Sequence, residues 1–165
     1  MEPAPHAKLA GRFREDPSLA RVRVAVSTEL CEGMRCQTTA RGHEVSADEP
    51  RSFGGGDTAQ SPVELLLTSL ATCQAITYRL WAAELGVVLD RVRVAVEGDL
   101  DLCGFLGIGE GLSAGYESIR VAVTLEGPEN AARYQALADA VDLHCPVFDV
   151  LSRPIPLERS LTLPA

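Results

Sequence analysis

The sequence lacks an excess of basic residues. Its 15 lysines and arginines are outnumbered by 23 aspartates and glutamates, which gives a net charge of −8 at pH 7. Proteins that bind nucleic acids or anionic membranes use lysine and arginine to neutralise phosphates, so this balance argues against both as main partners. A long uncharged apolar run is also missing, because residues 63–85 contain Glu64, Arg79 and Glu84. We therefore expect a buried helix there and no membrane span.

A disulfide framework and an export signal are also missing. The five cysteines are odd in number and widely spaced, and a chain of this length buries a sizeable core without crosslinks. The first nineteen residues contain charges and prolines but no apolar run of the kind that a signal peptide needs. We expect free or redox-active thiols in a reducing cytoplasm. We also predict one domain over residues 20–165, preceded by an N-terminal extension of residues 1–19.

Alternation of apolar and polar residues predicts the strands. Residues 20–26 alternate in this way, the string RVRVAV recurs at residues 91–96, and residues 119–125 repeat the pattern. The β-branched residues in these segments suit one packed face of a sheet. Weaker strands are predicted over residues 37–45 and 156–163.

The clearest helix signal begins at Ser61. This residue is an expected N-cap, Pro62 takes the first helical position, and Glu64 completes a capping box. The helix is expected to end before Gly86, after about 36 Å at about 1.5 Å per residue. Because apolar residues occupy nearly every face of it, it should be surrounded by protein. A second subunit is the natural cover, so we expect an oligomer.

A second helix is predicted between Pro128 and Pro146. Its apolar stripe, extended by one turn, reaches Cys145, which should lie at the end of the helix and face the core. Glycine-rich loops are expected over residues 48–60 and 98–115. The order of strands and helices, with mostly antiparallel pairing, indicates an α+β fold.

The cysteine with the most distinctive surroundings is Cys73, inside the apolar helix. A lone cysteine in such a place ordinarily packs as a small hydrophobic residue. Redox chemistry requires a cation or hydrogen-bond donors that stabilise the thiolate, and a second thiol that resolves the oxidised form. Cys145 is a candidate partner, although the residues alone leave every pairing of the five cysteines open.

Two other motifs carry possible chemistry. The string GLSAG at residues 111–115, followed by Asp142 and His144, matches the serine nucleophile elbow, but that motif requires a strand before the serine and a helix after it. Cys31 and Cys36 form one loose pair, whereas a zinc site usually shows two closely spaced pairs of ligands. The sequence context favours neither interpretation.

Taken together, three strings resemble the OsmC and organic-hydroperoxide-resistance family. They are GHEVSADEP, GGGDTAQSPVELLLTSLATC and HCPVFDVL, and the resemblance covers about residues 20–163. It implies an intertwined α+β homodimer with antiparallel sheets around a long buried central helix. It also implies a thiol peroxidase, in which Cys73 attacks an organic hydroperoxide and Cys145 resolves the resulting sulfenic acid. Members of the family need no metal or flavin and are recycled by dithiol reductants.

The sequence departs from the best-characterised members at one position. Those members place a glutamate directly after the helix-starting proline, where it orients an arginine that activates the cysteine. Here that position is Val63, and Glu64 lies about 180° around the helix from Cys73. Glu64 and Arg35 are the further site residues that we predict, with Arg41 as the other candidate arginine.

Two functions follow from these expectations. The first is a cytoplasmic, dimeric peroxidase that reduces organic hydroperoxides through Cys73 and Cys145. The alternative is a binding protein without peroxidase turnover, which holds a hydrophobic or thiol-bearing small molecule in the dimer crevice. The missing glutamate at Val63 is the feature that separates them.

Overall fold

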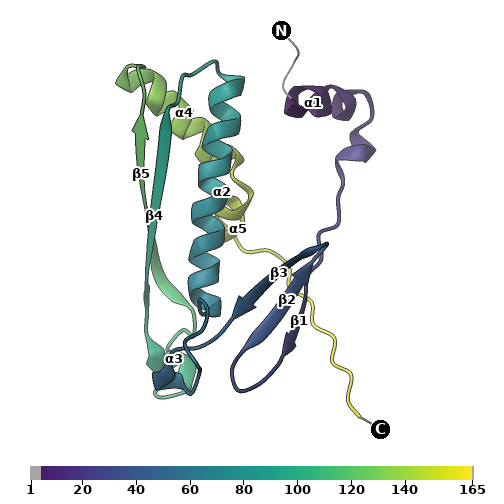
Figure 1. The fold of residues 1–165 in the computed structure, drawn as a ribbon, viewed down its shortest axis with the longest axis vertical. Coiled ribbons are helices and arrows are strands. Elements are labelled where there is room, and N and C mark those ends of the chain that lie inside the picture. The colour runs from purple at the N-terminus through teal and green to yellow at the C-terminus, as the bar shows by residue number, and fades with distance from the viewer. Residues whose placement is uncertain (1–4, 165) are drawn as a thin grey trace. The chain divides into compact units, whose positions relative to one another are not determined.

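The computed structural model describes residues 5–164. The chain falls into two compact units that divide between Leu65 and Leu66, inside the long helix α2. Helices and strands are mixed, as the α+β prediction requires (Figure 1). The elements before α2 are α1 (Pro5–Glu15), a 3-10 turn (Pro17–Ala20), β1 (Ser27–Leu30), β2 (Cys36–Ala40), β3 (His43–Ala47) and a second 3-10 turn (Arg51–Phe53). From α2 onward they are α2 (Pro62–Glu84), β4 (Arg91–Leu100), α3 (Leu102–Leu106), β5 (Tyr116–Glu126), α4 (Ala131–His144) and α5 (Pro146–Ser152).

The expected N-terminal extension contains α1, although its residues 1–4 lie outside the described residues. No helix was predicted there. The single domain predicted over residues 20–165 stays a prediction.

The first unit contains a small antiparallel sheet in the order β1-β2-β3. A side-chain hydrogen bond also links β1 to β2, because the hydroxyl oxygens of Thr28 and Thr38 are 2.8 Å apart. The single strand predicted over residues 37–45 is wrong in its extent, because Arg41 adopts a φ of 58° and the chain reverses there. The segment is therefore a hairpin of β2 and β3, in which Ala40 pairs with His43.

Two further strand predictions are wrong. Strands were predicted over residues 20–26 and 156–163, but residues 21–26 and 156–163 have no regular structure, and within residues 5–164 neither segment pairs with a strand. Val24 is 84% exposed and Leu157 is 92% exposed. Alternating side chains show that a segment suits a packed face, but a strand also needs a neighbour for its backbone N–H and C=O groups. The side-chain pattern says nothing about that neighbour.

The triple-glycine loop is organised by one carboxylate. Asp48 is buried and accepts hydrogen bonds from the backbone amides of Gly56 and Thr58 and, at 2.7 Å, from the Thr58 hydroxyl. The Thr58 hydroxyl is the main reason why the pKa of Asp48 falls to about 2, and it outweighs the opposing effect of burial. Gly55 has no room for a side chain, because a Cβ there would lie 1.9 Å from the Glu49 carbonyl oxygen.

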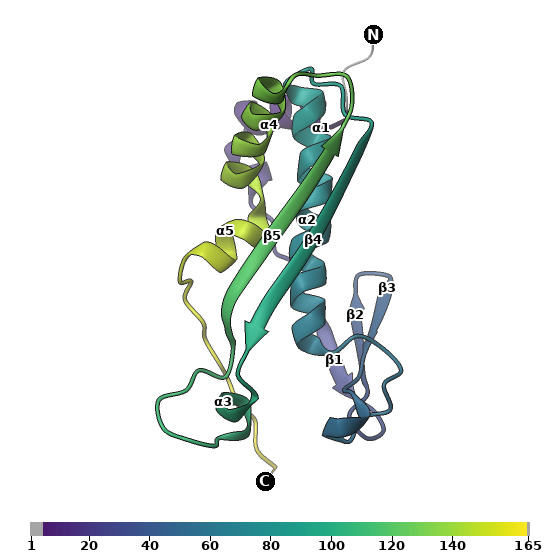
Figure 2. The ribbon, with the colours of Figure 1, turned by 90° about the vertical axis from the view of Figure 1, so that its left-hand side faces the viewer.

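In the second unit, α2 packs against the β4–β5 hairpin and α4 (Figures 1 and 2). The hairpin confirms the strands predicted at residues 91–96 and 119–125, and it contains the glycine-rich excursion with α3. Apolar side chains from α2, α4 and the loop after α2 form the core of the second unit. They are Tyr78, Ala82, Val87, Leu89, Leu137 and Val141.

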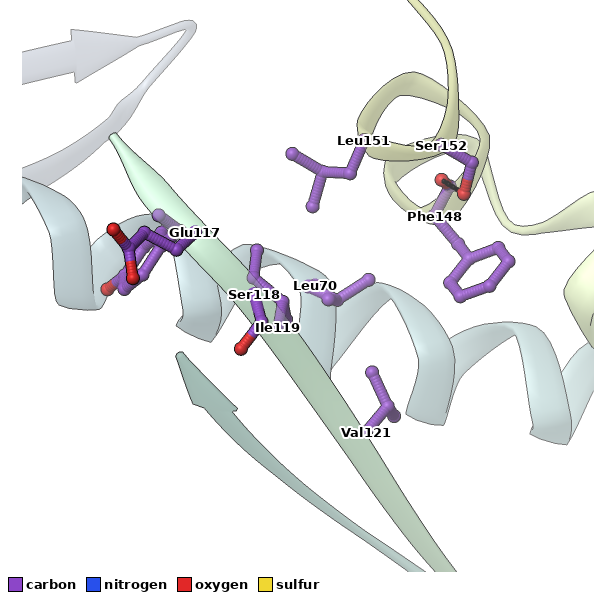
Figure 3. A pocket seen from close by; sticks show the side chains of 9 residues that line it. Leu70, Glu117, Ser118, Ile119, Val121, Phe148, Leu151 and Ser152 are labelled. Carbon is purple, nitrogen blue, oxygen red and sulfur yellow. Dashed lines mark hydrogen bonds between the residues drawn. The ribbon is translucent and has the colours of Figure 1, made fainter. Parts of the chain in front are cut away.

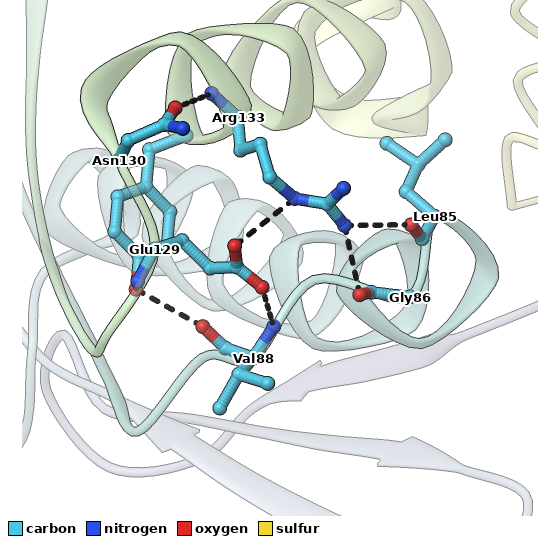
Figure 4. Close-up of polar contacts among 7 residues, drawn as sticks. Leu85, Gly86, Val88, Glu129, Asn130 and Arg133 are labelled. Atoms are coloured by element: carbon cyan, nitrogen blue, oxygen red, sulfur yellow. Dashed lines mark hydrogen bonds and ion pairs between the residues drawn. The ribbon is translucent and has the colours of Figure 1, made fainter.

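Both ends of α2 are held by hydrogen bonds. At the start, the predicted capping box is confirmed: the Ser61 amide and hydroxyl donate to the Glu64 carboxylate at 2.8 and 2.9 Å. At the other end, Arg133 of α4 donates to the Gly86 carbonyl at 2.8 Å and pairs with Glu129 at 3.1 Å (Figure 4). Gly86 has a φ of 60°, a left-handed conformation that suits glycine at the end of a helix.

Only one face of α2 is buried in the single chain. Leu70, Gln74 and Tyr78 on that face are at most 3% exposed. On other faces, Ile76 is 68% exposed and Leu80 is 38% exposed. The chain alone therefore leaves a substantial apolar surface of this helix uncovered.

Candidate active site

Two cysteines lie side by side in the second unit. Cys73 lies in the middle of α2 and Cys145 lies at the junction of α4 and α5, and their Sγ atoms are 3.3 Å apart. Cys145 is completely buried, whereas Cys73 is partly exposed, and both are free thiols. Residues 72 positions apart in sequence thus bring two sulfurs within reach of a disulfide bond.

The backbone holds Cys145 firmly. Its amide donates to the Val141 carbonyl at 2.9 Å, so it ends α4, and its carbonyl accepts from Asp149, so it also begins α5. Pro146 takes the first position of α5, where the missing N–H has no helical partner to lose. The prediction that Cys145 lies at a helix end and faces the core is confirmed.

The two thiols have different surroundings. Burial raises the pKa of Cys145, and the neighbouring Cys73 raises it further, while the Phe148 amide and the Thr77 hydroxyl act in the opposite direction. The net upward shift keeps Cys145 protonated at neutral pH. Its S–H is therefore available as a donor to the sulfur of Cys73.

A cavity of about 320 Å³ opens beside Cys73. Its described lining residues are mostly apolar and include no arginine or lysine; besides Cys73 they are Ile76, Thr77, Leu80, Trp81, His144 and Pro146. The rings of Trp81 and His144 lie together, with centroids 4.1 Å apart and planes inclined by 33°. Such a cavity suits an uncharged, apolar group next to the thiol.

A second cavity, of about 390 Å³, lies between α2, β5 and α5. Leu70, Val121 and Phe148 point into it (Figure 3). Neither cysteine belongs to its described lining, so it is distinct from the cavity at Cys73.

The other predicted site residues have different surroundings. The Glu64 carboxylate is engaged by Ser61, whose backbone amide is the main reason for its lowered pKa. Arg35 lies between β1 and β2 in the first unit, where it lines a cavity of about 710 Å³ with Cys31 and Asp48. As catalytic residues, Glu64 and Arg35 stay predictions.

The GLSAG string and the pair of Cys31 and Cys36 were the two other motifs with possible chemistry, and the structure describes the surroundings of both. Ser113 lies in the loop between α3 and β5, so the strand and helix that a nucleophile elbow requires do not flank it. Among residues 5–164 no group of three or more His, Cys, Asp or Glu side chains is placed to hold a metal ion. In the same part of the chain, no helix has the length and apolar character to span a membrane.

Comparison with known proteins decides the family. A model of the OsmC-like proteins matches residues 54–160, a range that contains both Cys73 and Cys145. The chain belongs to the OsmC-like family. This confirms the family predicted from the sequence motifs, and no curated protein sequence matches the chain.

Solved structures of OsmC-like proteins share the fold of this chain. An OsmC-like protein from Mycoplasma pneumoniae has a TM-score of 0.70 at 17% identity, over 79% of this chain and 88% of that one. An organic hydroperoxide resistance protein from Legionella pneumophila has a TM-score of 0.60 at 18% identity, over 79% and 89%. One from Elizabethkingia anophelis, with thiocyanate bound, has a TM-score of 0.59 at 14% identity, over 78% and 87%. At such identities the likeness shows the shared fold.

Sequence reasoning missed two residues of this OsmC-like cavity, Trp81 and Thr77. Both follow Cys73 at multiples of four, a spacing that places them on one face of α2. From the sequence, His144 was placed only in the serine nucleophile-elbow pattern, although it directly precedes Cys145. The pairing of α2 with α4, which puts His144 beside Trp81, is a tertiary contact that no local pattern contains.

Proposed function

We propose that this OsmC-like protein is a thiol peroxidase that reduces organic hydroperoxides. The observation that carries the proposal is the 3.3 Å separation of two free sulfurs, one of which borders an apolar cavity. Solved relatives described as organic hydroperoxide resistance proteins support the same substrate class.

The different burial of the two cysteines supports different roles for them in the proposed cycle. Cys73 borders the cavity, so it meets the hydroperoxide first. Its sulfur bonds to the terminal peroxide oxygen, the O–O bond breaks, and an alcohol leaves, which gives a sulfenic acid on Cys73. Cys145 then attacks that sulfur, water leaves, and a disulfide forms. An external dithiol restores both thiols, which fits the reducing cytoplasm that we propose as the location.

The test is one equivalent of cumene hydroperoxide followed by peptide mass analysis. We expect a Cys73–Cys145 disulfide in the wild-type protein. Cys145→Ser should stop at a sulfenic acid on Cys73 that dimedone traps, while Cys103→Ser, which removes an exposed thiol, should behave like the wild type. An unmodified or merely over-oxidised Cys73 in the wild-type protein would contradict the peroxidase cycle.

The binding protein remains the second candidate, and two observations favour it. Val63 replaces the glutamate of the well-characterised members, and the described lining of the cavity contains no arginine or lysine. A binding protein would take up apolar molecules at Cys73 without turnover. Hydroperoxide-dependent consumption of dithiothreitol separates the two functions, because only the peroxidase shows it.

We propose in addition that the protein acts as a homodimer. The exposed apolar residues of α2, such as Ile76, and the exposed valines of residues 21–26 are surfaces that a second copy would cover. Light scattering should give about 35 kDa, twice the 17.6 kDa of one chain. Ile76→Asp should shift the protein toward the monomer, and Ile76→Val should leave it dimeric. A wild-type monomer at micromolar concentration would refute the dimer.

A further inference from the structure

The imidazole of His144 has a defined orientation. His144 is the last residue of α4, and its Nδ1 lies 2.7 Å from the carbonyl oxygen of Ala140. A carbonyl can only accept, so the hydrogen bond assigns the ring proton to Nδ1. The other ring nitrogen, Nε2, then carries a lone pair in the neutral ring and is free to accept a proton.

A second contact fixes the ring against α2. The Trp81 ring packs on it with centroids 4.1 Å apart, and both rings line the cavity at Cys73. The ionisable groups in the described lining of this cavity are Cys73 and His144, with the Cys145 sulfur directly behind Cys73.

From this arrangement we propose that His144 is the acid–base residue of the site. Nε2 takes the proton of the Cys73 thiol as its sulfur attacks the hydroperoxide. The O–O bond breaks, the terminal oxygen remains on sulfur, and the imidazolium returns the proton to the departing alkoxide, which leaves as an alcohol. The return step rests on the proposed peroxidase function; the removal of the proton from Cys73 does not.

The rest of the site explains why a histidine is needed. The carboxylate of Glu64 is engaged at the start of α2, Val63 cannot ionise, and the described lining holds no arginine or lysine. Histidine is the side chain that exchanges protons most readily near neutral pH. It therefore supplies at this cavity the activation that an arginine and a glutamate supply in other members of the family.

The test measures two rates at Cys73 between pH 5 and 9. One is alkylation by iodoacetamide, quantified on the Cys73 peptide, and the other is disulfide formation with cumene hydroperoxide. His144→Phe keeps an aromatic ring against Trp81 but has no nitrogen. We expect it to slow disulfide formation at pH 7 by about 100-fold, in the range of general acid–base catalysis. We also expect it to change the pH profile of alkylation.

Controls separate chemistry from packing. His144→Ala should lose the same activity, and added imidazole should restore part of it, which a structural role does not predict. His43→Phe, on β3 in the first unit, should match the wild type. If His144→Phe folds poorly by Trp81 fluorescence, His144→Asn replaces it, because that variant can donate to Ala140 but has no Nε2.

The outcomes for the two proposals are distinct. If the wild-type protein forms no disulfide but the His144 variants still alter the alkylation profile, the peroxidase function fails and the role of His144 as the base that takes the Cys73 proton stands. If the disulfide forms and the variants change neither the rates nor the profile, the role of His144 is overturned and the peroxidase function stands.

Discussion

Different interactions stabilise the interior of each of the two units. The second unit buries apolar side chains from several elements, and Leu137 and Val141 are completely buried. In the described part of the first unit, the buried residues are Ala47, Asp48 and Ser61, two of which are polar. The first unit therefore depends on directed hydrogen bonds, and the second on an apolar core that needs no particular partner atom. The second unit also contains the sulfur pair, so the proposed chemistry lies in the unit with the apolar core.

The largest expected effect comes from breaking the core of the second unit. Leu137→Ala removes a fully buried side chain and should lower the free energy of unfolding by about 2–5 kcal/mol. Trp81 is the single tryptophan and lies in this unit, so its fluorescence during urea unfolding reports the loss. Leu157→Ala is the matched control, since Leu157 is 92% exposed, and it should cost at most about 0.5 kcal/mol. Equal losses in the two variants would contradict this account of the core.

The next effect should be confined to the first unit. Asp48→Asn removes a carboxylate whose pKa is lowered to about 2, so its stabilising contribution exists above about pH 4 and disappears as the pH falls toward 2. Hydrogen exchange should show less protection of β2 and β3 in the variant at pH 7 and similar protection in both proteins near pH 2. The unfolding transition reported by Trp81 fluorescence should stay unchanged. A shift as large as that of Leu137→Ala would contradict the view that the hydrogen bonds of Asp48 stabilise the first unit alone.

A smaller effect of opposite sign is expected at Gln74. Its side chain is 1% exposed, and its Nε2 has no hydrogen-bond partner among the described residues. Replacement by Met, which has a similar size, should raise the free energy of unfolding by about 1 kcal/mol, because the unsatisfied amide is removed. Gln135→Met is the control, since Gln135 lies exposed on α4 and is bonded to Asp139. No gain for Gln74→Met would mean that the buried amide has a partner in solution.

The smallest effect concerns the end of α2. Arg133→Met removes donors to the carbonyls of Leu85 and Gly86 and an ion pair with Glu129, but its side chain is 46% exposed, so solvent weakens these contacts. We expect a loss of at most about 1 kcal/mol in urea unfolding. Arg153→Met, which breaks an exposed ion pair with Asp149, should lose less. A larger loss of stability in Arg153→Met than in Arg133→Met would show that the contacts of Arg133 contribute little.

Local signals in the sequence predicted the long helix and the β4–β5 hairpin well. The capping box at Ser61 and Glu64 marks the start of α2, and Gly86 marks its end, because these residue types satisfy backbone groups that a helix leaves unpaired. The β4–β5 hairpin follows from alternation alone, since its two strands pair with each other. Cys145 was placed correctly because proline ends one helix and starts the next.

The first unit was predicted less well, because its structure depends on strand neighbours and on backbone conformations that side-chain patterns do not contain. Its residues 21–26 carry the alternation of a packed strand, but in the described chain no neighbouring strand accepts them. The reversal at Arg41 depends on a left-handed conformation at a residue other than glycine, which composition does not reveal. The closeness of the two sulfurs was expected only from the resemblance to a family, because helix pairing is a property of the whole fold.

The short distance between the sulfurs of Cys73 and Cys145, which lies between α4 and α5, affects the rate of the proposed cycle. A disulfide bond is about 2.05 Å long, so the sulfurs at 3.3 Å must approach by little more than about 1 Å, which a small rotation of the side chains supplies. No segment has to unwind before the second step and none has to refold after it. We therefore expect the supply of electrons to limit turnover, and steady-state rates to rise in proportion to the concentration of the dithiol.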